Sequence, residues 1–406
     1  MGYTKDTLKG FSWGVGIDIS SKGISFAKNI ILSRFIFGPA EFGIFGVGFL
    51  ILGFLELITE TGINVYLVQE KDGVKEYLDT AWVVSIARGI IISVIIAILS
   101  YPIALFFKIP DYRNFILATS IIPLVRGFLN PGIVSLQKNL KFRKDSLFRF
   151  TVYVIEDIAT LIFAFATHSV FSFVLGVLIG VIVEVILTFV LVTERPKFSF
   201  NKEKLSKIIH RGKWLTAAYI FDYLFEHGDD FAVGKLLNVA SLGIYQLSYT
   251  ISIVPQKTIA ERLGRVTFPV FTKIVEDKKR VKRAFLRTVF VTFILVGAFG
   301  VVLYFVADPV VRLVLGEKWL PAIPVLRVLA FFGVVRAMTN LAYPLFLAYK
   351  KQEYISATTL VGIVVLGILI VPLTLKLGLI GAGVAAIIGS LASLPVAAYF
   401  VIKILK

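Results

Sequence analysis

The chain has 406 residues, of which 57% are hydrophobic and only 17% are charged. Soluble globular domains are about 45–50% apolar and about 25% charged, so this composition excludes an ordinary soluble protein and indicates an integral membrane protein. The net charge is +17 and there are no cysteines, which excludes a disulfide framework and thiolate chemistry.

Twelve apolar stretches follow one another along the chain. Each is long enough for a transmembrane helix, which needs roughly 20 mostly apolar residues. The connections between them are short, which leaves no room for a separate soluble catalytic domain. We therefore expect an all-α integral membrane fold with about twelve spans. The stretches are residues 11–36, 42–68, 80–107, 114–137, 147–167, 169–193, 213–236, 241–268, 285–307, 321–348, 354–375 and 379–402.

The basic residues of the connections test this number of spans. If the N-terminus lies in the cytoplasm, the loops on that side carry 27 Lys and Arg residues, and the opposite loops carry 6. Cytoplasmic loops hold an excess of Lys and Arg, so the alternation predicts an even number of spans with both termini in the cytoplasm. We expect a multi-pass protein of the cytoplasmic membrane. Its positive charge faces membrane lipids, and no nucleic-acid partner is expected.

The longest polar stretch, residues 194–213, lies halfway along the chain and reads ERPKFSFNKEKLSKIIHRGK. Its pattern fits a cytoplasmic amphipathic linker lying on the headgroups, and it fits a flexible linker equally well. On either side of it, residues 1–193 and residues 214–406 are predicted to form two bundles of six helices.

Short motifs recur in the two halves at nearly constant spacing of 200 to 210 positions. Because each half has an even number of helices, both halves enter the membrane from the same side. This predicts a parallel pseudo-two-fold repeat about the membrane normal, with a cavity between the bundles. The matching motifs are Phe42–Phe45 with Leu242–Tyr245, Ile58 and Glu60 with Ile259 and Glu261, and Val125, Arg126 and Asn130 with Val335, Arg336 and Asn340.

Charged residues interrupt the predicted spans. Each costs about 2.5–3.5 kcal/mol at the centre of a membrane helix, so many of them must face water or oppositely charged partners. A hydrated central cavity would accommodate them together. The basic residues are Lys22, Lys28, Arg34, Arg88, Arg126, Lys257, Arg262, Arg265, Arg327 and Arg336, and the acidic residues are Asp18, Glu56, Glu60, Glu156, Asp157, Glu184, Asp222, Glu226, Asp229, Asp230 and Glu261.

Two of the spans carry polar stripes at helical spacing. The stripes fit a cavity for a substrate and a coupling ion, but interhelical salt bridges that only hold the bundle together would give the same pattern. The first span contributes Asp18, Ser21, Lys22, Ser25 and Asn29, and the seventh contributes Asp222, Glu226, Asp229 and Asp230.

The duplicated pair Arg126 and Arg336 lies near mid-span in both halves. A guanidinium is always charged and binds phosphate in a bidentate manner, so one hypothesis makes both residues phosphate ligands. The alternative is packing against the carbonyls of helix ends. Glu56 and Glu60 fit either a gate or local pairing.

Four segments carry a family resemblance, and it runs in order along essentially the whole chain: Leu32–Gly43, Leu140–Phe142, Asp229–Tyr245 and Gly316–Trp319. They resemble the polysaccharide-transporter (Wzx-like) flippases of the multidrug/oligosaccharidyl-lipid/polysaccharide (MOP) exporter superfamily. The resemblance implies a MATE-like plan of two six-helix bundles, which the sister families share.

The resemblance implies that the chain moves a lipid-linked oligosaccharide, carried on a polyprenyl phosphate or pyrophosphate, across the cytoplasmic membrane by alternating access. It implies no cofactor, a proton or Na⁺ as candidate coupling ion, and glycan polymerase or glycosyltransferase machinery as candidate partners. The substrate-binding candidates are then Lys22, Lys28, Asn29, Arg34, Arg88, Arg126, Asn130, Arg336 and Asn340. The ion-coupling candidates are Asp18, Asp222, Glu226, Asp229 and Asp230.

Two other functions compete with this one. An ion-coupled multidrug or cation antiporter of the sister MATE type would bind cationic drugs at Asp222, Glu226 and Asp229. A membrane glycan polymerase or ligase would need a large external loop, and the longest here, about residues 308–320, is too short. The sequence offers no nucleophile–base pair and no metal-ligand spacing, so we expect a transporter and not an enzyme.

Overall fold

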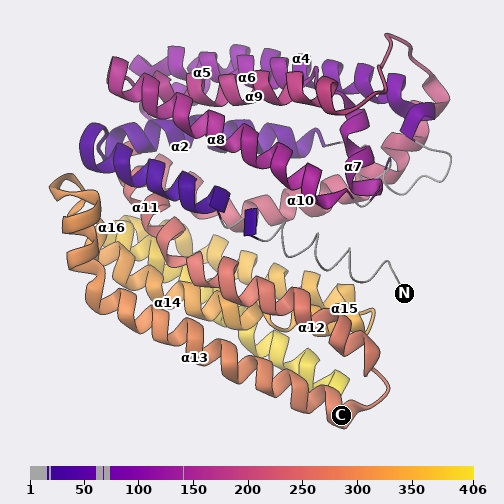
Figure 1. Cartoon of the computed structure of the whole chain (residues 1–406). Coiled ribbons are helices and arrows are strands. Elements are labelled where there is room, and N and C mark those ends of the chain that lie inside the picture. Colours follow the sequence, from indigo (N-terminus) through magenta and orange to yellow (C-terminus); the bar gives the residue numbers. More distant parts are fainter. Residues whose placement is uncertain (1–15, 18–19, 61–66, 68–73, 140) are drawn as a thin grey trace. The chain divides into compact units, whose positions relative to one another are not determined.

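The computed structural model describes residues 16–17, 20–60, 67, 74–139 and 141–406, and every regular element in these ranges is a helix (Figure 1). Inside the helices, the side chains of residues 74–75, 204, 206–219 and 221–222 are not described. The chain divides into two compact units. Unit 1 holds the described residues up to Phe37 and Ile44–Tyr223, and unit 2 holds Gly38–Gly43 and Leu224–Lys406.

Unit 1 consists of long apolar helices joined by tight turns. His168 adopts a left-handed conformation (φ 50°), which ends one helix and lets the next begin at Phe171. Pro110 and Pro131 start short 3₁₀ turns, because proline fits the first position of a helix but cannot continue one. The elements are η1 (Leu32–Ile36), most of α2 (Pro39–Ile58), α4 (Val74–Phe106), η2 (Pro110–Tyr112), α5 (Arg113–Thr119), α6 (Ile121–Arg126), η3 (Pro131–Val134), α7 (Ser135–Lys138), α8 (Phe142–Thr167), α9 (Phe171–Leu191) and the first part of α10 (Lys202–Leu236).

Unit 2 has the same character, with π-helical turns where helices join. Its elements after α10 are α11 (Val239–Ser252), η4 (Gln256–Ala260), α12 (Glu261–Lys273), α13 (Lys278–Val310), η5 (Val311–Leu315), η6 (Glu317–Trp319), α14 (Ala322–Asn340), α15 (Tyr343–Ala348) and α16 (Gln352–Leu405).

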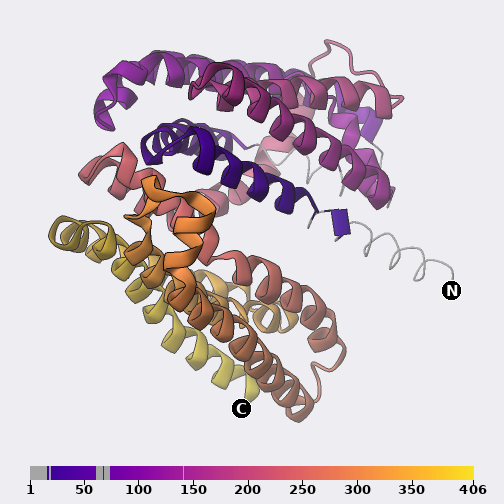
Figure 2. The same cartoon turned by 60° about the vertical axis from the view of Figure 1, so that its left-hand side comes forward.

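The long element α16 is two helices joined at Gly378. This glycine has φ 61° and ψ −140°, a conformation that side chains with a Cβ rarely adopt. The two arms pack on each other, since the Ser393 hydroxyl donates to the carbonyl of Thr358 at 3.1 Å. They lie side by side in Figures 1 and 2. The predicted stretches 354–375 and 379–402 are therefore the two arms of one helical hairpin.

The predicted repeat appears as a reciprocal contact within unit 2. A Cβ on Gly43 in α2 would lie 1.7 Å from the carbonyl oxygen of Val239, and a Cβ on Gly243 in α11 would lie 2.1 Å from that of Pro39. Val239 lies 200 positions after Pro39, and Gly243 lies 200 positions after Gly43. Contacts that exchange in this way are the signature of a two-fold axis. The two glycines let α2 and α11 cross at backbone contact.

Seven of the described helices are long and apolar enough to cross a bilayer, or eight if the pair Pro110–Arg126 and Pro131–Lys138, bent by 70°, forms one span. Of the seven, α16 alone holds two of the predicted stretches. The stretch 11–36 lies partly outside the described residues. The segments α10, α11 and α12 do not pass this test. The number twelve therefore stays a prediction.

The predicted linker 194–213 divides into two parts with different structure. Residues 202–213 continue without a break into the stretch 213–236, so both belong to α10. Residues 194–201 are not helical and are held against α4: the amide of Lys197 donates to Asp79 Oδ1 at 2.8 Å, and that of Asn201 donates to Thr80 Oγ1 at 3.3 Å. The domain boundaries at 193 and 213 stay predictions.

Candidate functional site

A cavity of about 630 Å³ lies inside unit 1, between α2, α4, α8, α9 and the bent segment from α6 to α7. Charged side chains from these elements line the cavity. The outside of the same unit exposes large apolar side chains; Ile98 and Val190, for example, are each 70% exposed. The polar residues of the lining are Glu56, Glu60, Ser85, Arg88, Arg126, Asn130, Gln137, Asp145, Arg149, Glu184 and Thr188.

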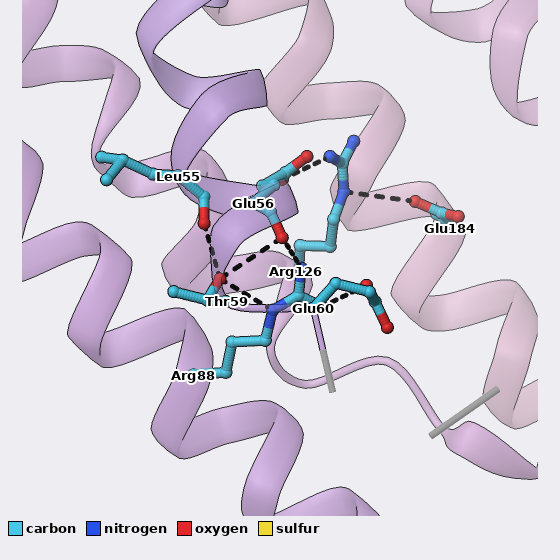
Figure 3. Close-up of polar contacts among 7 residues, drawn as sticks. All are labelled: Leu55, Glu56, Thr59, Glu60, Arg88, Arg126 and Glu184. Atoms are coloured by element: carbon cyan, nitrogen blue, oxygen red, sulfur yellow. Dashed lines mark hydrogen bonds and ion pairs between the residues drawn. The ribbon is translucent and has the colours of Figure 1, made fainter. Parts of the chain in front are cut away.

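Arg126, in the last turn of α6, lies between two carboxylates (Figure 3). One guanidinium nitrogen is 2.7 Å from Glu56 Oε1 of α2, and Nε is 3.9 Å from Glu184 Oε2 of α9. Glu156 of α8 also lies close enough to interact with Arg126 electrostatically. Arg126, the duplicated arginine of the first half, thus interacts electrostatically with acidic residues of three helices: α2, α8 and α9.

Arg88 of α4 contacts the C-terminal end of α2. Its guanidinium is 3.1 Å from Glu60 Oε2, and it donates to Thr59 Oγ1 at 3.1 Å and to the carbonyl oxygen of Glu56. The last carbonyls of a helix lack partners within the helix, and a cation there is favoured by the helix dipole. Figure 3 shows Arg88 and Arg126 reaching the same turn of α2.

The charges of the lining are nearly balanced. The carboxylates of Glu56, Glu60, Asp145 and Glu184 face the guanidinium groups of the three arginines, and Arg149 pairs with Asp145 at 3.1 Å. No arginine of this lining is left without a carboxylate within 4 Å. A phosphate that binds at a guanidinium group here competes with a carboxylate that already lies beside it.

A second buried ion pair of unit 1 joins the first predicted span to α8. Lys28 Nζ lies 2.6 Å from Asp157 Oδ1, and the Ser25 hydroxyl donates to Asp157 Oδ2 at 2.6 Å. Ser25 belongs to the predicted stripe of this span, and Lys28 is one of the predicted substrate-binding residues. Their common partner, Asp157, is buried.

Arg336 of α14, the counterpart of Arg126, lies among aromatic rings inside unit 2. Its guanidinium carbon is 4.6 Å from the ring centre of Phe225 and 5.6 Å from that of Phe332. One nitrogen lies 3.3 Å from Glu226 Oε1, at a carboxylate that is half exposed. The arginine itself is buried, and cation–π contacts with these two rings add to its ion pair.

Two adjacent carboxylates of α10, Asp229 and Asp230, are buried in unit 2. The Tyr245 hydroxyl donates to Asp229 Oδ2 at 2.6 Å, and the amide of Asp230 donates to Asp229 Oδ1 at 3.0 Å. Asp230 Oδ2 lies 3.0 Å from His227 Nδ1. This arrangement gives one carboxylate a hydroxyl donor and the other an imidazole.

The sequence comparison assigns the chain to a family. The family described as "Polysaccharide biosynthesis protein" matches residues 31–324, well over half of the chain. The chain belongs to this family.

Named relatives of this polysaccharide biosynthesis protein cover most of its length. It is 25% identical over 355 residues to the lipopolysaccharide biosynthesis protein WzxC of Escherichia coli K12, a match that covers 87% of this chain and 72% of the relative. It is 21% identical over 330 residues to the succinoglycan biosynthesis transport protein ExoT of Rhizobium meliloti 1021, covering 80% and 66%.

Solved structures show the fold. The lipid II flippase MurJ, in an inward closed conformation, matches with a TM-score of 0.81 at 15% identity, covering 97% of this chain and 88% of that chain. An inward-facing multidrug resistance MATE transporter of the MOP superfamily matches with a TM-score of 0.69 at 17% identity, covering 95% and 94%. The predicted family and the MATE-like, all-α membrane fold are confirmed. The protein is a multi-pass membrane protein.

The predicted site residues of this family member fall in different surroundings. Arg88, Arg126 and Asn130 line the cavity of unit 1, whereas Lys22 and Arg34 are exposed and Asn29 and Asn340 are half-buried. Asn130 is fully buried. Its side chain accepts a hydrogen bond from the Gly132 amide and donates one to the Glu194 carbonyl, so these contacts stabilise the local fold. Asp18 and the side chain of Asp222 lie outside the described residues.

Several functional candidates were not assigned a role from the sequence. Glu184, Asp157 and Glu156 stood out only as charges inside spans, because their partners come from helices far away in the chain. Thr59 and His227 carried no signal of their own. The i, i+4 spacing of Glu56 and Glu60 does place both on one face of α2, and both line the cavity.

Proposed function

We propose that this protein is a flippase that moves a lipid-linked oligosaccharide across the cytoplasmic membrane by alternating access. The carrier lipid is a polyprenyl phosphate or pyrophosphate, and both termini lie in the cytoplasm. Family membership supports the role in polysaccharide biosynthesis, and the relative from Rhizobium meliloti is named as a transport protein. No covalent chemistry is assigned to the chain.

The observation that carries the proposal is a cavity lined by guanidinium groups inside an apolar unit. Arg88 and Arg126 are placed where an ordinary membrane helix would hold apolar side chains. Guanidinium groups bind phosphate oxygens through paired hydrogen bonds and can replace the water around an anionic headgroup. Glycan hydroxyls find partners in the amides and hydroxyls of the same lining.

Substrate binding then involves an exchange of partners. In the described state Arg126 is occupied by Glu56 and Glu184. An entering phosphate takes the place of one carboxylate, and the released carboxylate takes up a proton or a sodium ion. Apart from Arg88 and Arg126, the proposed substrate-binding residues are Lys22, Lys28, Asn29, Arg34, Asn130, Arg336 and Asn340.

The proposed coupling acids gather in unit 2, with Asp229 as the first choice. It is buried, and its carboxylate is held by Tyr245 and by the amide of Asp230. Asp229→Asn keeps the size of the side chain and removes the titratable group. We expect this variant to change the dependence of transport on the proton or Na⁺ gradient, and an unchanged dependence would remove Asp229 as the coupling site. Asp18, Asp222, Glu226 and Asp230 complete the proposed set.

The deciding experiment is reconstitution into vesicles with a defined lipid-linked oligosaccharide. A lectin added outside measures how much glycan has crossed, with and without ion gradients and with protein-free vesicles as control. We expect protein-dependent transfer that responds to a gradient. Transfer equal to that of protein-free vesicles under every gradient contradicts the proposal.

A multidrug or cation antiporter is the second candidate. The acidic group Glu226, Asp229 and Asp230 in unit 2 favours it, because these side chains suit a cationic drug. A parallel measurement with a fluorescent cationic dye in the same vesicles separates the two. Dye transport without glycan transfer would establish the antiporter instead.

A further inference from the structure

Arg327 lies in the second turn of α14. It differs in its partners from the other arginines of the predicted spans whose contacts are described above. Arg88, Arg126 and Arg336 each lie within 4 Å of a carboxylate. For Arg327 the described residues supply no carboxylate, and its Nε is buried without a hydrogen-bond partner. A charged donor without an acceptor is costly at membrane depth. The side chain of Arg327 is partly exposed, so a ligand from outside the protein can supply acceptors to its guanidinium group.

The neighbours of Arg327 are aromatic rings rather than acids. Its guanidinium carbon lies 5.7 Å from the ring centre of Tyr304 in α13, and the rings of Tyr304 and Phe331 are 5.6 Å apart. Tyr304 is 37% exposed and Phe331 is 50% exposed. In a membrane protein, exposed rings of this kind on the outside of a helix pair face the bilayer.

The side of α14 that carries Arg327 is opposite to the side that carries Arg336. The two residues are nine positions apart, which is about 2.5 turns of an α-helix, or half a turn in direction. Arg336 contacts Phe225 and Glu226 of α10. Arg327 instead shares its face with Phe331, four residues later. It lines neither the cavity of unit 1 nor a second, open cavity of unit 2 at Pro321, Pro324 and Gly378.

The depth of Arg327 matches a headgroup. It lies five residues after the start of α14, about 7.5 Å along the axis, and Tyr304 lies six residues, about 9 Å, before the end of α13. The α13–α14 connection joins the end of α13 to the start of α14. Both distances are therefore measured from the same end of the helix pair, and the two residues lie at similar depth. Arginine and tyrosine at this depth reach the boundary between acyl chains and headgroups.

We propose that Arg327 and Tyr304 form a binding site for the phosphate of a bilayer phospholipid in the leaflet next to the α13–α14 connection. The guanidinium donates to the phosphate oxygens, and the acyl chains run along the exposed face that includes Phe331 and Phe305. The occupant is a phospholipid rather than the transported lipid, because the site faces the bilayer and not a cavity. The site does not depend on the proposed transport activity.

The test measures lipids that stay bound to the purified protein. Protein in mild detergent is mixed with phosphatidylglycerol, and native mass spectrometry counts the bound molecules. We expect Arg327→Gln to lower the affinity for one bound phospholipid about tenfold. The matched control is Arg312→Gln, which removes an exposed arginine at the same end of α13 that is paired with Asp308 at 3.0 Å. The control is expected to retain the lipid.

Two further measurements keep the test decisive. Arg327→Lys retains the charge without the planar donor pair, so it is expected to bind with intermediate affinity, and it serves if Arg327→Gln fails to fold. Competition with undecaprenyl phosphate identifies the occupant. Equal retention of phosphatidylglycerol by Arg327→Gln, Arg327→Lys and Arg312→Gln overturns the site, and displacement only by undecaprenyl phosphate overturns the assignment to a bilayer phospholipid.

Discussion

Arg126 and Arg336 occupy corresponding positions in the two halves of the chain, yet their surroundings have little in common. Arg126 lines a cavity and lies between the carboxylates of Glu56 and Glu184. Arg336 is buried beside the rings of Phe225 and Phe332, and the carboxylate that pairs with it at 3.3 Å, that of Glu226, is half exposed. The repeat has kept the guanidinium and changed what it contacts.

The difference teaches that a repeated charge in a membrane protein need not have a repeated role. A guanidinium between two carboxylates can exchange partners with an anion, because it already forms charge-assisted hydrogen bonds in a polar cavity. A guanidinium stacked on rings is held by its planar shape as much as by its charge. We therefore propose that the first half contributes the larger part of substrate binding.

The largest effect is expected from Arg126→Ala. The change leaves Glu56 and Glu184 without their counter-ion, and breaking a fully buried pair costs about 3–5 kcal/mol. The side chain of Arg126 is 36% exposed, so water reduces this to about 1–3 kcal/mol. Glycan export by cells that depend on this protein should be abolished while the protein still inserts.

Arg336→Ala is the matched variant for this measurement. We expect it to lose part of the export and not all of it. Normal export in both variants would rule out a phosphate-binding role for the duplicated arginines, and equal losses would remove the distinction between the two halves.

Lysine substitutions should separate the two arginines by shape. Arg336→Lys keeps the charge but loses the flat face that packs on Phe225, so it should lower the free energy of unfolding by about 1–2 kcal/mol. Arg126→Lys can still pair with Glu56 and should lose less. Thermal unfolding of the two purified variants in the same detergent measures the difference, and a larger loss for Arg126→Lys would contradict it.

The smallest effects are expected from the carboxylate partners. Glu226→Gln removes a half-exposed partner and should change stability by less than about 1 kcal/mol. Glu184→Gln leaves Arg126 its closer partner, Glu56, and should cost about 1 kcal/mol. A loss for Glu226→Gln well above that for Glu184→Gln, in the same unfolding assay, would mean that charge rather than stacking holds Arg336.

The sequence was sufficient for the membrane class and for the existence of the repeat, because both depend on composition and on short motifs. The break between residues 375 and 379 was also visible, and Gly378 supplies its turn. The pairs Arg126–Glu184 and Lys28–Asp157 could not be predicted. Each depends on which helices pack together and at what height, and hydropathy does not encode that.

Some predicted candidates received roles that spacing alone could not distinguish. Asn130 forms hydrogen bonds that hold the chain around it, although its repeat position suggested a ligand. Lys28 was predicted to bind substrate together with Lys22 of the same span, but only the buried partner Asp157 shows that its charge is compensated inside unit 1. A helical stripe gives the direction of a side chain and not the identity of its partner.

The reciprocal contact of Gly43 and Gly243 has a consequence for the independence of the two halves. The first turn of α2 is coded in the first half of the chain, but it packs with the residues of unit 2. A chain cut at residue 193 or 213 would separate this turn from the helix it crosses. Unit 2 is thus built from both halves of the sequence, and its compact body includes a turn that the first half supplies.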